Sequence, residues 1–472
     1  MHLDDTIVAI ATPAGRGGIG VVRISGPDAR AIARPMLRLA HQHDLEAGHA
    51  HFGELIEPAS GERIDEVVVT FFAKPHSYTT DDVVEISCHG SPVVLRHVVE
   101  MAIAGGARLA EPGEFTMRAF LNGRIDLTQA EAVRDLIESQ TLYQAQVAAR
   151  QLDGALSKRL QPVKQKLVEL IATMEAGVDF AEDDVAVIAD EQILARIAAI
   201  HAPLEELLAS FAFGKVVHEG LTLAIVGQPN VGKSSLFNCL VESERAIVTA
   251  TPGTTRDLVS ETVAIGGIPV RLVDTAGIRV ARDEAESIGV RKSMEALAEA
   301  DVVLIVLDAA NPSESRGAPD SNPDAQLVAK SEGRVRLVVL NKIDLAPEAR
   351  APVDRLASPH LARLLRPDGC VDTSALTGEG VEELRKKILQ LVGGDTGAQR
   401  ESGFLTNVRQ KQLVADAIGS LDKAVAAVPQ KIPHEMLLLD LYSALRALDE
   451  ITGATTADDI LNLIFSSFCI GK

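Results

Sequence analysis

The chain has 472 residues, which is too long for one ordinary core, and about 150 residues per domain suggests three domains. With 46% hydrophobic and 24% charged residues and no apolar run of roughly 20 residues, the composition excludes general disorder and a membrane span, so we expect a cytoplasmic protein. The 46 basic and 66 acidic side chains give a net charge of −20, which opposes non-specific adhesion to nucleic acid because such adhesion relies on neutralising many phosphates.

The first 120 residues predict a small α+β domain. Short apolar runs such as IGVVRIS, EVVVTFF and DVVEIS are separated by Gly and Pro, and helical patterns cover 27–40 and 92–104. Arg23 in the first run can pair with Glu85 in the third, either in a binding pocket or as an ordinary surface ion pair.

Two helical regions lie on either side of a segment in which strands and helices alternate. Residues from about 126 to 213 are rich in Ala, Leu, Gln and Glu, and helical composition returns after about residue 393. Between them, LTLAIVG, VRLVDTAG, DVVLIVLDA and RLVVLNKID alternate with helical patterns, which predicts a parallel, doubly wound sheet. We therefore predict a multidomain protein in which an α/β domain is inserted into a helical domain. Two unrelated helical units are the alternative.

A phosphate-binding loop is predicted at 227–234. The segment GQPNVGKS follows an apolar strand and precedes a helical pattern, which is the context that such a loop requires. Its glycines let backbone N–H groups surround phosphate oxygens, Lys233 reaches the β and γ phosphates, and Ser234 offers a hydroxyl to Mg²⁺. The segment predicts a nucleoside triphosphate site.

The segment NKID at 341–344 predicts that the base is guanine. It ends a strand of the sheet, at the edge where doubly wound sheets bind ligands. Asp344 can accept hydrogen bonds from N1–H and the exocyclic amine of guanine, which adenine does not offer, and Lys342 can lie along the ring. Ser374 and Ala375 follow a further apolar strand and can add backbone N–H groups to the pocket.

The group that orients the attacking water is not evident from the motifs. Ras-type enzymes use a Gln directly after the D-x-x-G motif, whereas Ile278 follows DTAG here. Thr255 is placed to be a second Mg²⁺ ligand, and Asp274 to hold a metal-bound water. The missing group comes from Arg256 or Arg279, from a downstream carboxylate or from a bound cation, and the residues alone leave these alternatives open.

The C-terminal FCIGK places Cys469 fourth from the end. We reject prenylation, because Gly471 is not aliphatic, Lys472 is an atypical last residue and no polybasic run precedes them. A buried cysteine and a reactive thiolate remain the two interpretations. The other cysteines lie far apart with no C-x-x-C pair, which argues against a zinc site and against disulfides.

These segments together resemble the MnmE (TrmE) family of tRNA-modification GTPases along the whole chain. The resemblance is carried by DTIVAIATPAGRGGIGVVRISG, SYTTDDVVEISCHG, PGEFTMRAFLNGRIDLTQAEAV, the nucleotide motifs with GTTRD, and FCIGK. It implies an N-terminal folate-binding and dimerisation domain, a discontinuous α-helical domain and an inserted α/β, Ras-like G domain. We expect boundaries at 1–122 for the first, 123–215 and 394–472 for the helical domain, and 216–393 for the G domain.

The resemblance also implies a reaction. Family members are K⁺-stimulated GTPases that act with the FAD-dependent partner MnmG (GidA) at carbon 5 of wobble uridine in certain tRNAs. They attach a carboxymethylaminomethyl or aminomethyl group there, with carbon from a tetrahydrofolate derivative such as the 5-formyl or methylene form. The implied assembly is a homodimer in a heterotetramer or larger complex with MnmG, away from membranes, with Mg²⁺ and K⁺ as cofactors.

The family's folate residues carry over to matching positions in this chain. The resemblance implies that Arg23, Glu85, Arg124 and Lys472 bind the folate and that Cys469 is functionally required.

For hydrolysis, the resemblance supplies a replacement for the missing glutamine. It implies a K⁺ ion held by the side chain of Asn230 and by oxygens of Thr249, Thr251 and Thr254, with Glu286 orienting the catalytic water through a bridging water. Lys233 and Asn230 are the catalytic residues expected in the phosphate loop. The expected GTP-binding residues are Asn230, Val231, Gly232, Lys233, Ser234, Ser235, Thr249, Ala250, Thr251, Pro252, Gly253, Thr254, Thr255, Asp274, Thr275, Ala276, Gly277, Asn341, Lys342, Asp344, Ser374, Ala375 and Leu376.

The alternative is a ribosome or RNA assembly factor of the Era or EngA kind, in which GTP switches the affinity for RNA. Such proteins carry an RNA-binding KH module or a second G domain. This chain shows neither a G-x-x-G clamp between basic helices nor a second phosphate loop, and it is acidic. A ferrous-iron transporter would need membrane spans.

Overall fold

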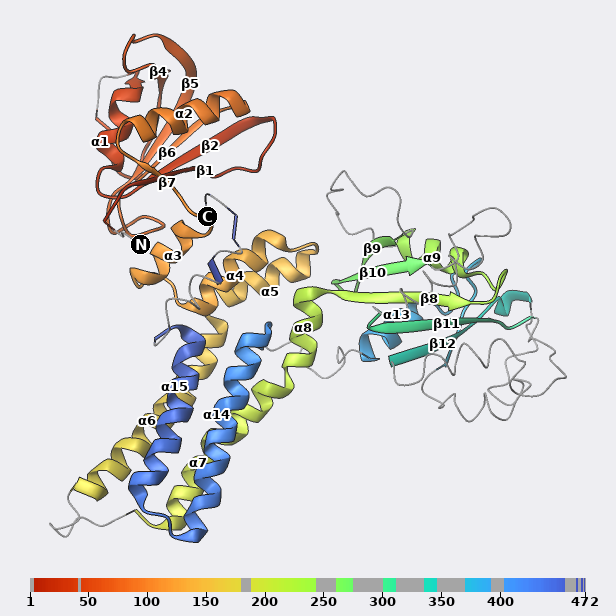
Figure 1. Cartoon of the computed structure of the whole chain (residues 1–472). Helices are drawn as coiled ribbons and strands as arrows, with labels where there is room; N and C mark the ends of the chain where they lie inside the picture. Colours follow the sequence, from red (N-terminus) through yellow and green to blue (C-terminus); the bar gives the residue numbers. More distant parts are fainter. Residues whose placement is uncertain are drawn as a thin grey trace, which may run out of the picture. The chain divides into compact units, whose positions relative to one another are not determined.

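The structure is a computed structural model of the whole chain (Figure 1). It describes residues 4–40, 44–179, 188–242, 260–274, 300–310, 335–345, 370–391, 403–454, 464–465, 468–469 and 471. The chain separates into two compact units. Unit 1 comprises Met1–Arg134, Gln151–Leu160 and Tyr442–Lys472, and unit 2 comprises Asp135–Arg150 and Gln161–Leu441. Both units therefore combine segments that lie far apart in the sequence.

Unit 1 contains a seven-stranded sheet in the order β3-β4-β5-β6-β2-β1-β7. Its pairs are antiparallel except for β1 with β7. The strands are β1 (Ile7–Ile10), β2 (Gly17–Ser25), β3 (Leu37–Leu39), β4 (Ala50–Ile56), β5 (Arg63–Phe72), β6 (Val83–Gly90) and β7 (Arg108–Leu109). The helical segments are α1 (Ala29–Ala33), η1 (Arg34–Met36), α2 (Pro92–Ala104), α3 (Glu114–Leu121) and α4 (Leu127–Glu138), of which α4 continues past the unit boundary.

The two faces of this sheet differ. One face is buried with α1 and α2 in a continuous hydrophobic core that includes Val22, Ile86 and Leu95. Because side chains alternate along a strand, the intervening residues point to the other face. There Arg23 lies opposite Glu85 across the β2–β6 pair, so the second face, rather than the one covered by α1 and α2, carries the polar pair singled out in the sequence.

A buried ion network fixes the start of α3 to the sheet. The carboxylate of Glu114, which is fully buried, accepts hydrogen bonds from Arg108 (2.7 Å) and Arg118 (2.9 Å), and Arg118 also donates to the Asp5 backbone oxygen (2.7 Å). Burial alone raises the pKa of Glu114, but the bonds from Arg108, the Glu111 backbone and Arg118 outweigh it and hold the pKa below its ordinary value. Burial likewise raises the pKa of Asp5, but hydrogen bonds from Arg108 and Arg118 outweigh it and lower the pKa.

The C-terminal residues return to unit 1. Phe465 and Phe468 are buried in a cluster with Met117 and Leu127. Gly113 has a φ of 69°, and a Cβ atom there would lie 2.5 Å from the backbone oxygen of Phe465. Only glycine fits such a close approach at a positive φ, so the loop before α3 is shaped to receive the C-terminal segment. This loop is the PGEF segment that also starts α3.

Helices that precede and follow the inserted sheet in the sequence pack together in unit 2. Buried residues of α7 (Asp190–Ala209) include Ile200 and Leu204, and those of α14 (Val408–Ala427) include Ala417 and Leu421. A hydrogen bond of 3.0 Å joins Nε2 of His201 in α7 to Oδ1 of Asp422 in α14. The predicted discontinuous helical domain is thereby confirmed. The remaining helical segments here are α5 (Leu142–Leu152), α6 (Ala155–Asp179), α8 (Phe211–Glu219), η8 (Val428–Gln430) and α15 (His434–Thr452), of which α5, α6 and α15 cross the unit boundary.

Within the described residues, one helical stretch, Asp190–Glu219, has the length and hydropathy of a membrane span. It consists of two helices, α7 and α8, and its apolar residues Ile193, Ile197, Ile200, Leu204 and Leu207 are buried in the protein. A core helix of a soluble protein meets the same criterion, so the stretch is weak evidence for a membrane segment.

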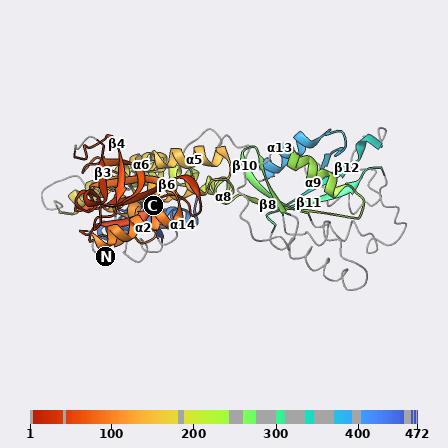
Figure 2. The same ribbon diagram turned by 90° about the horizontal axis from the view of Figure 1, so that it is seen from above.

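The sheet of unit 2 has six strands in the order β13-β12-β11-β8-β10-β9, all parallel except β9. The predicted parallel sheet is confirmed. Residues of α9 (Lys233–Glu242) and α13 (Val381–Leu391) share one core on the same face of the sheet, as Figure 2 shows. The strands are β8 (Leu221–Gly227), β9 (Ser260–Ile265), β10 (Ile268–Asp274), β11 (Val302–Asp308), β12 (Val335–Asn341) and β13 (Cys370–Asp372), and a short η3 (Ile343–Leu345) follows β12.

Candidate functional site

The phosphate loop joins β8 to α9 at the carboxyl edge of the parallel sheet. β8 ends at Gly227 and α9 begins at Lys233. Gly232 has a φ of 96°, and a Cβ atom there would lie 2.3 Å from the side-chain nitrogen of Asn341. Only glycine permits this conformation and this approach, which brings the backbone of the loop against the segment that follows β12.

Lys233 lies inside the loop and is almost fully buried. Its Nζ donates to the backbone oxygens of Gly227 (2.9 Å) and Gln228 (2.7 Å). An ammonium held at the helix N-terminus, beside backbone N–H groups, is the arrangement that binds the β and γ phosphates of a nucleotide. Ser234 is the next residue of α9, and its hydroxyl oxygen is a suitable ligand for Mg²⁺.

Asn341, the last residue of β12, connects the phosphate loop to the loop before α13. Its Nδ2 donates to the Val231 backbone oxygen (3.0 Å), and its Oδ1 accepts from the backbone N–H of Ala375 (3.0 Å) and from the hydroxyl of Thr373 (3.3 Å). It is 1% exposed. A buried amide with these bonds ties together three loops, so it sets their spacing rather than reading the base directly.

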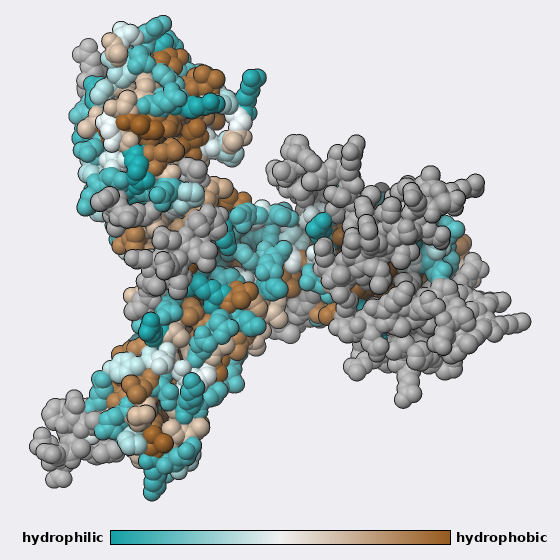
Figure 3. Space-filling view, viewed as in Figure 1, coloured by the Kyte–Doolittle hydropathy of each residue, from teal (hydrophilic) through white to brown (hydrophobic). Residues whose placement is uncertain are grey.

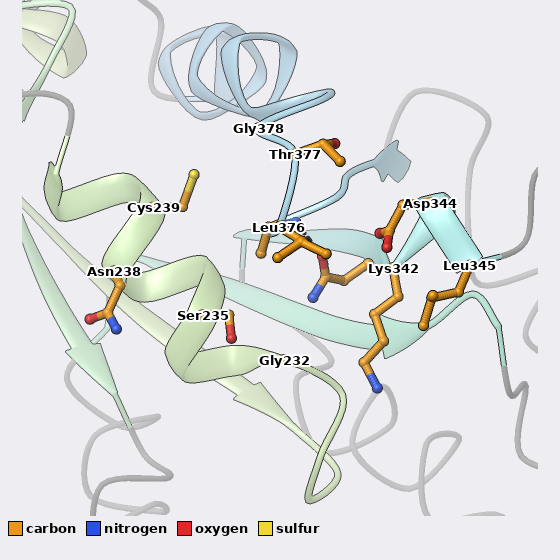
Figure 4. A pocket seen from close by; sticks show the side chains of 12 residues that line it. Gly232, Ser235, Asn238, Cys239, Lys342, Asp344, Leu345, Leu376, Thr377 and Gly378 are labelled. Atoms are coloured by element: carbon orange, nitrogen blue, oxygen red, sulfur yellow. Dashed lines mark hydrogen bonds between the residues drawn. The ribbon is translucent and has the colours of Figure 1, made fainter.

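A cavity of about 580 Å³ opens between these loops (Figure 4). Asp344 lies at this cavity, and the Ser374 hydroxyl donates to its Oδ1 at 2.6 Å, which fixes the carboxylate. The cavity is lined by residues of α9, of the segment after β12 and of the loop before α13. The lining residues are Gly232, Ser235, Asn238, Cys239, Asn341, Lys342, Asp344, Leu345, Ala375, Leu376, Thr377 and Gly378.

The structure adds residues that the motifs did not single out. Asp308 ends β11 at the same edge, and its Oδ2 lies 2.6 Å from Nζ of Lys342. Asn238 and Cys239 line the cavity from α9. The sequence signal for Asp308 was its place at the end of the run DVVLIVLDA, one strand away from NKID, because parallel strands end at one edge.

Several expected residues lie outside the described part of the chain. They are Thr249, Ala250, Thr251, Pro252, Gly253, Thr254, Thr255, Arg256, Thr275, Ala276, Gly277, Ile278, Arg279, Glu286 and Lys472. The backbone of Asp274 is described as the last residue of β10. Among the described ranges, no group of three or more His, Cys, Asp or Glu side chains could hold a metal ion.

Unit 1 carries a second candidate site around Tyr78. Nε and Nη2 of Arg23 donate to one carboxylate oxygen of Glu85 at 2.9 and 2.7 Å, and both side chains are largely buried. The guanidinium carbons of Arg23 and Arg124 lie 5.5 and 5.6 Å from the centre of the Tyr78 ring. The structure therefore brings Arg23, Glu85 and Arg124 around one aromatic ring, with Phe115 also 5.5 Å from the Arg23 guanidinium.

Tyr78 was quoted within SYTTDD but was not singled out from the sequence. Its hydroxyl lies 2.9 Å from the Thr116 hydroxyl, and burial raises its pKa above the ordinary value. Two residues later, Thr80 has a φ of 66°. A β-branched residue is strained in this region, and such strain is found disproportionately at binding sites. The loop is held, since Asn122 donates to the Thr79 backbone oxygen (2.7 Å).

Cys469 lies in the C-terminal segment seated beside α3. Its backbone oxygen accepts from the N–H of Gly113 at 3.4 Å, and its side chain is exposed. Two other cysteines lie in sheets, Cys88 buried and Cys370 partly buried, where loss of contact with water raises the pKa of Cys88 to about 12 and that of Cys370 to about 11. Those two thiols stay protonated at neutral pH, and Cys469 differs from them by its exposure.

Comparison with known proteins covers the whole chain. A family model described as MnmE helical domain matches residues 127–469, and one described as GTP-binding protein TrmE N-terminus matches residues 6–124. The tRNA modification GTPase MnmE of Koribacter versatilis is 64% identical over 473 residues, and that of Acetivibrio thermocellus is 42% identical over 474 residues. Each alignment covers 100% of both chains.

Among solved structures, the G domain of the T. maritima FeoB iron transporter is 29% identical, with a TM-score of 0.26. It matches 36% of this chain and 98% of that chain. The full-length identity to the relatives and the two family models together decide the assignment. The chain belongs to the MnmE family of tRNA modification GTPases.

Proposed function

We propose that the chain hydrolyses GTP at the cavity between the phosphate loop and the segment after β12, and that hydrolysis serves the modification of wobble uridine in tRNA. The observation that carries the proposal is the Asn341 amide, which joins the phosphate loop to the loop of Ala375 beside the fixed carboxylate of Asp344. A carboxylate that accepts two hydrogen bonds favours guanine over adenine.

For catalysis we propose a K⁺ ion in place of a water-orienting glutamine. Asn230 has a φ of 64° in the phosphate loop, and its side-chain oxygen is the ligand we assign to the ion, together with Thr249, Thr251 and Thr254. Mg²⁺ held by Ser234 and Thr255 would neutralise phosphate charge. Glu286 is the proposed residue that orients the attacking water.

The potassium proposal predicts a cation effect on turnover. GTP hydrolysis by the full chain is expected to be faster in K⁺ than in Na⁺ at equal ionic strength, and Asn230→Ala is expected to remove the difference. The measurement is phosphate release at saturating GTP. Equal wild-type rates in the two salts would exclude a K⁺-dependent mechanism.

We propose that the site around Tyr78 binds a tetrahydrofolate derivative, in the 5-formyl or methylene form. Its support is the Arg23–Glu85 pair beside two aromatic rings, since a pterin is flat and has donors and acceptors at its edge. A guanidinium and a carboxylate can bond that edge, and Arg124 with Lys472 can face the glutamate carboxylates of the ligand. Cys469 is proposed to act in the transfer chemistry.

The folate proposal predicts a loss of ligand binding without a loss of GTP hydrolysis. Arg23→Ala is expected to weaken binding of 5-formyl-tetrahydrofolate by at least about tenfold, because it removes a charged hydrogen-bonding group. The measurement is calorimetric titration, with GTP turnover as the control for the GTP site and amide hydrogen exchange of β2 and β6 as the control for folding of unit 1. If Arg23→Ala binds the folate as tightly as the wild type does, the folate does not bind at Arg23.

We further propose that the chain acts in the cytoplasm as a homodimer, with tRNA and with the flavoprotein MnmG in a heterotetramer or larger complex. Figure 3 shows hydrophobic residues on the visible surface of the sheet domain of unit 1, and its strands expose Ile19, Phe52 and Val68. Exposed apolar side chains of this kind support a dimerisation role for that domain. We propose domain boundaries at 1–122, 123–215, 216–393 and 394–472.

A further inference from the structure

We propose that Asp308 is a positioning residue of the nucleotide site, which fixes Lys342 so that its ammonium joins the base-binding segment to the phosphate loop. Neither the nucleotide motifs nor the family resemblance assigns this residue. The inference rests on the proposed GTP site and deepens it.

Asp308 is held in place by its own strand and turn. It is the last residue of β11, where it lies opposite Asn341 of β12. Its Oδ1 accepts from the backbone N–H of Ala310 at 2.9 Å, and its Oδ2 accepts from Nζ of Lys342 at 2.6 Å. The Asp308 side chain is 12% exposed and that of Lys342 is 28% exposed. A carboxylate fixed at both oxygens and mostly shielded from water is a rigid anchor for a flexible lysine.

The same lysine reaches the phosphate loop. Its Nζ also donates to the Asn230 backbone oxygen at 2.6 Å. Lys342 and Asn230 have φ values of 69° and 64°, and they are two of four non-glycine residues with positive φ in the described ranges. Left-handed backbone is unfavourable for a non-glycine residue, so the contact joins two segments that are both held in an unfavourable conformation.

Two hydrogen bonds therefore join the end of β12, residues 341–342, to the phosphate loop. One is the Asn341 amide on the Val231 backbone oxygen, and the other is the Lys342 ammonium on the Asn230 backbone oxygen. The described Asp308 contacts support only the second of these hydrogen bonds. Without the carboxylate, the long lysine side chain regains several rotamers, and the energy of ordering it again must come from nucleotide binding. The expected effect is a loss of nucleotide affinity.

The chain offers a matched control at the other end of β11. Asp301 directly precedes β11, and its Oδ2 accepts from the Thr222 backbone N–H at 2.9 Å. It is a carboxylate with one backbone bond at the edge of the sheet opposite the cavity. Asp301→Asn makes the same chemical change as Asp308→Asn without touching Lys342.

The test is calorimetric titration of the full chain with GDP, together with turnover at saturating GTP. Asp308→Asn is expected to weaken GDP binding about tenfold, while Asp301→Asn binds GDP like the wild type. Turnover at saturating GTP is expected to stay unchanged in the control Asp301→Asn, which shows that a carboxylate can be changed at the other end of β11 without loss of the folded G domain. Asp308→Glu, which keeps the charge, is expected to bind GDP more tightly than Asp308→Asn.

A double-mutant comparison shows whether Asp308 acts through Lys342. Lys342→Ala should weaken binding by itself, and adding Asp308→Asn to it should cause no further loss. Losses that multiply in the double variant, or wild-type affinity in Asp308→Asn, would overturn the inference. If Asp308→Asn is poorly folded, the GDP affinities of Asp308→Glu and Lys342→Ala still test the inference. Asp308→Glu must bind GDP more tightly than Lys342→Ala does. A wild-type chain that fails to bind GDP would instead contradict the proposed function.

Discussion

Replacing Asp344 by Asn is expected to move the nucleotide preference of the chain from guanosine to xanthosine. The Asp344 carboxylate lies at the cavity with one oxygen fixed by Ser374. It can accept from both N1–H and the exocyclic amine of guanine. An Asn amide there can accept one bond but offers its NH₂ group to the second position, where xanthine has an oxygen. We expect GDP affinity to fall on the order of 100-fold, or about 2.8 kcal/mol.

The measurement is competition of GDP and XDP for the full chain with Asp344→Asn. Asp372→Asn is a suitable control, because this residue is exposed at the end of β13 and does not line the cavity. Ser374→Ala should give an intermediate loss of GDP affinity, since the carboxylate remains but its orienting hydroxyl is gone. If Asp344→Asn binds GDP as tightly as the control does, then guanine is read by other residues.

Replacing Arg118 by Met is expected to destabilise the sheet of unit 1 by about 3–5 kcal/mol. Arg118 is 1% exposed, and its removal leaves the fully buried Glu114 carboxylate with Arg108 as its remaining side-chain partner. The Asp5 backbone oxygen also loses its bond from Arg118. Hydrogen exchange of amides in β1, β2 and β6 would measure the change in opening free energy.

An exposed pair provides the control for this change. Arg38→Met breaks the Arg38–Glu54 contact at 2.9 Å, in which Arg38 is 54% exposed, and should change stability by about 1 kcal/mol or less. The Arg118 effect should also depend on pH. Because Glu114 and Asp5 have lowered pKa values in the folded chain, their stabilisation is present above the ordinary values of 4.5 and 3.8 and is lost as pH falls through the folded values. The difference between wild type and Arg118→Met should therefore shrink in acid, and equal protection at pH 7 would contradict the network's role.

The meeting of the phosphate-loop segment and the NKID segment at one edge of the sheet was predictable because each segment is short and local. GQPNVGKS and NKID each follow an apolar strand, and the strand order of a parallel sheet brings such strand ends to one edge. The residue types then indicate the chemistry, a lysine for phosphate and a carboxylate for guanine. The insertion of this sheet between helical segments followed from the change in composition on either side.

Residues that act through long-range contacts could not be given a role in this way, even where a strand end indicated their position. Asp308 lies 34 residues before Lys342, and its role depends on the pairing of β11 with β12. Tyr78 gains its position from Thr116, 38 residues later, and from two arginines on different elements. The close approach of Gly113 to Phe465 joins the two ends of the chain. Such contacts depend on packing between elements, which residue spacing does not encode.

The most direct test of the account is the nucleoside composition of tRNA from a strain that lacks this chain. Mass analysis should show loss of the carboxymethylaminomethyl and aminomethyl groups at wobble uridine, restored by the wild-type chain and not by Asp344→Asn. Wobble uridine that keeps both modifications in the deletion strain would contradict the proposal that this GTP site serves tRNA modification.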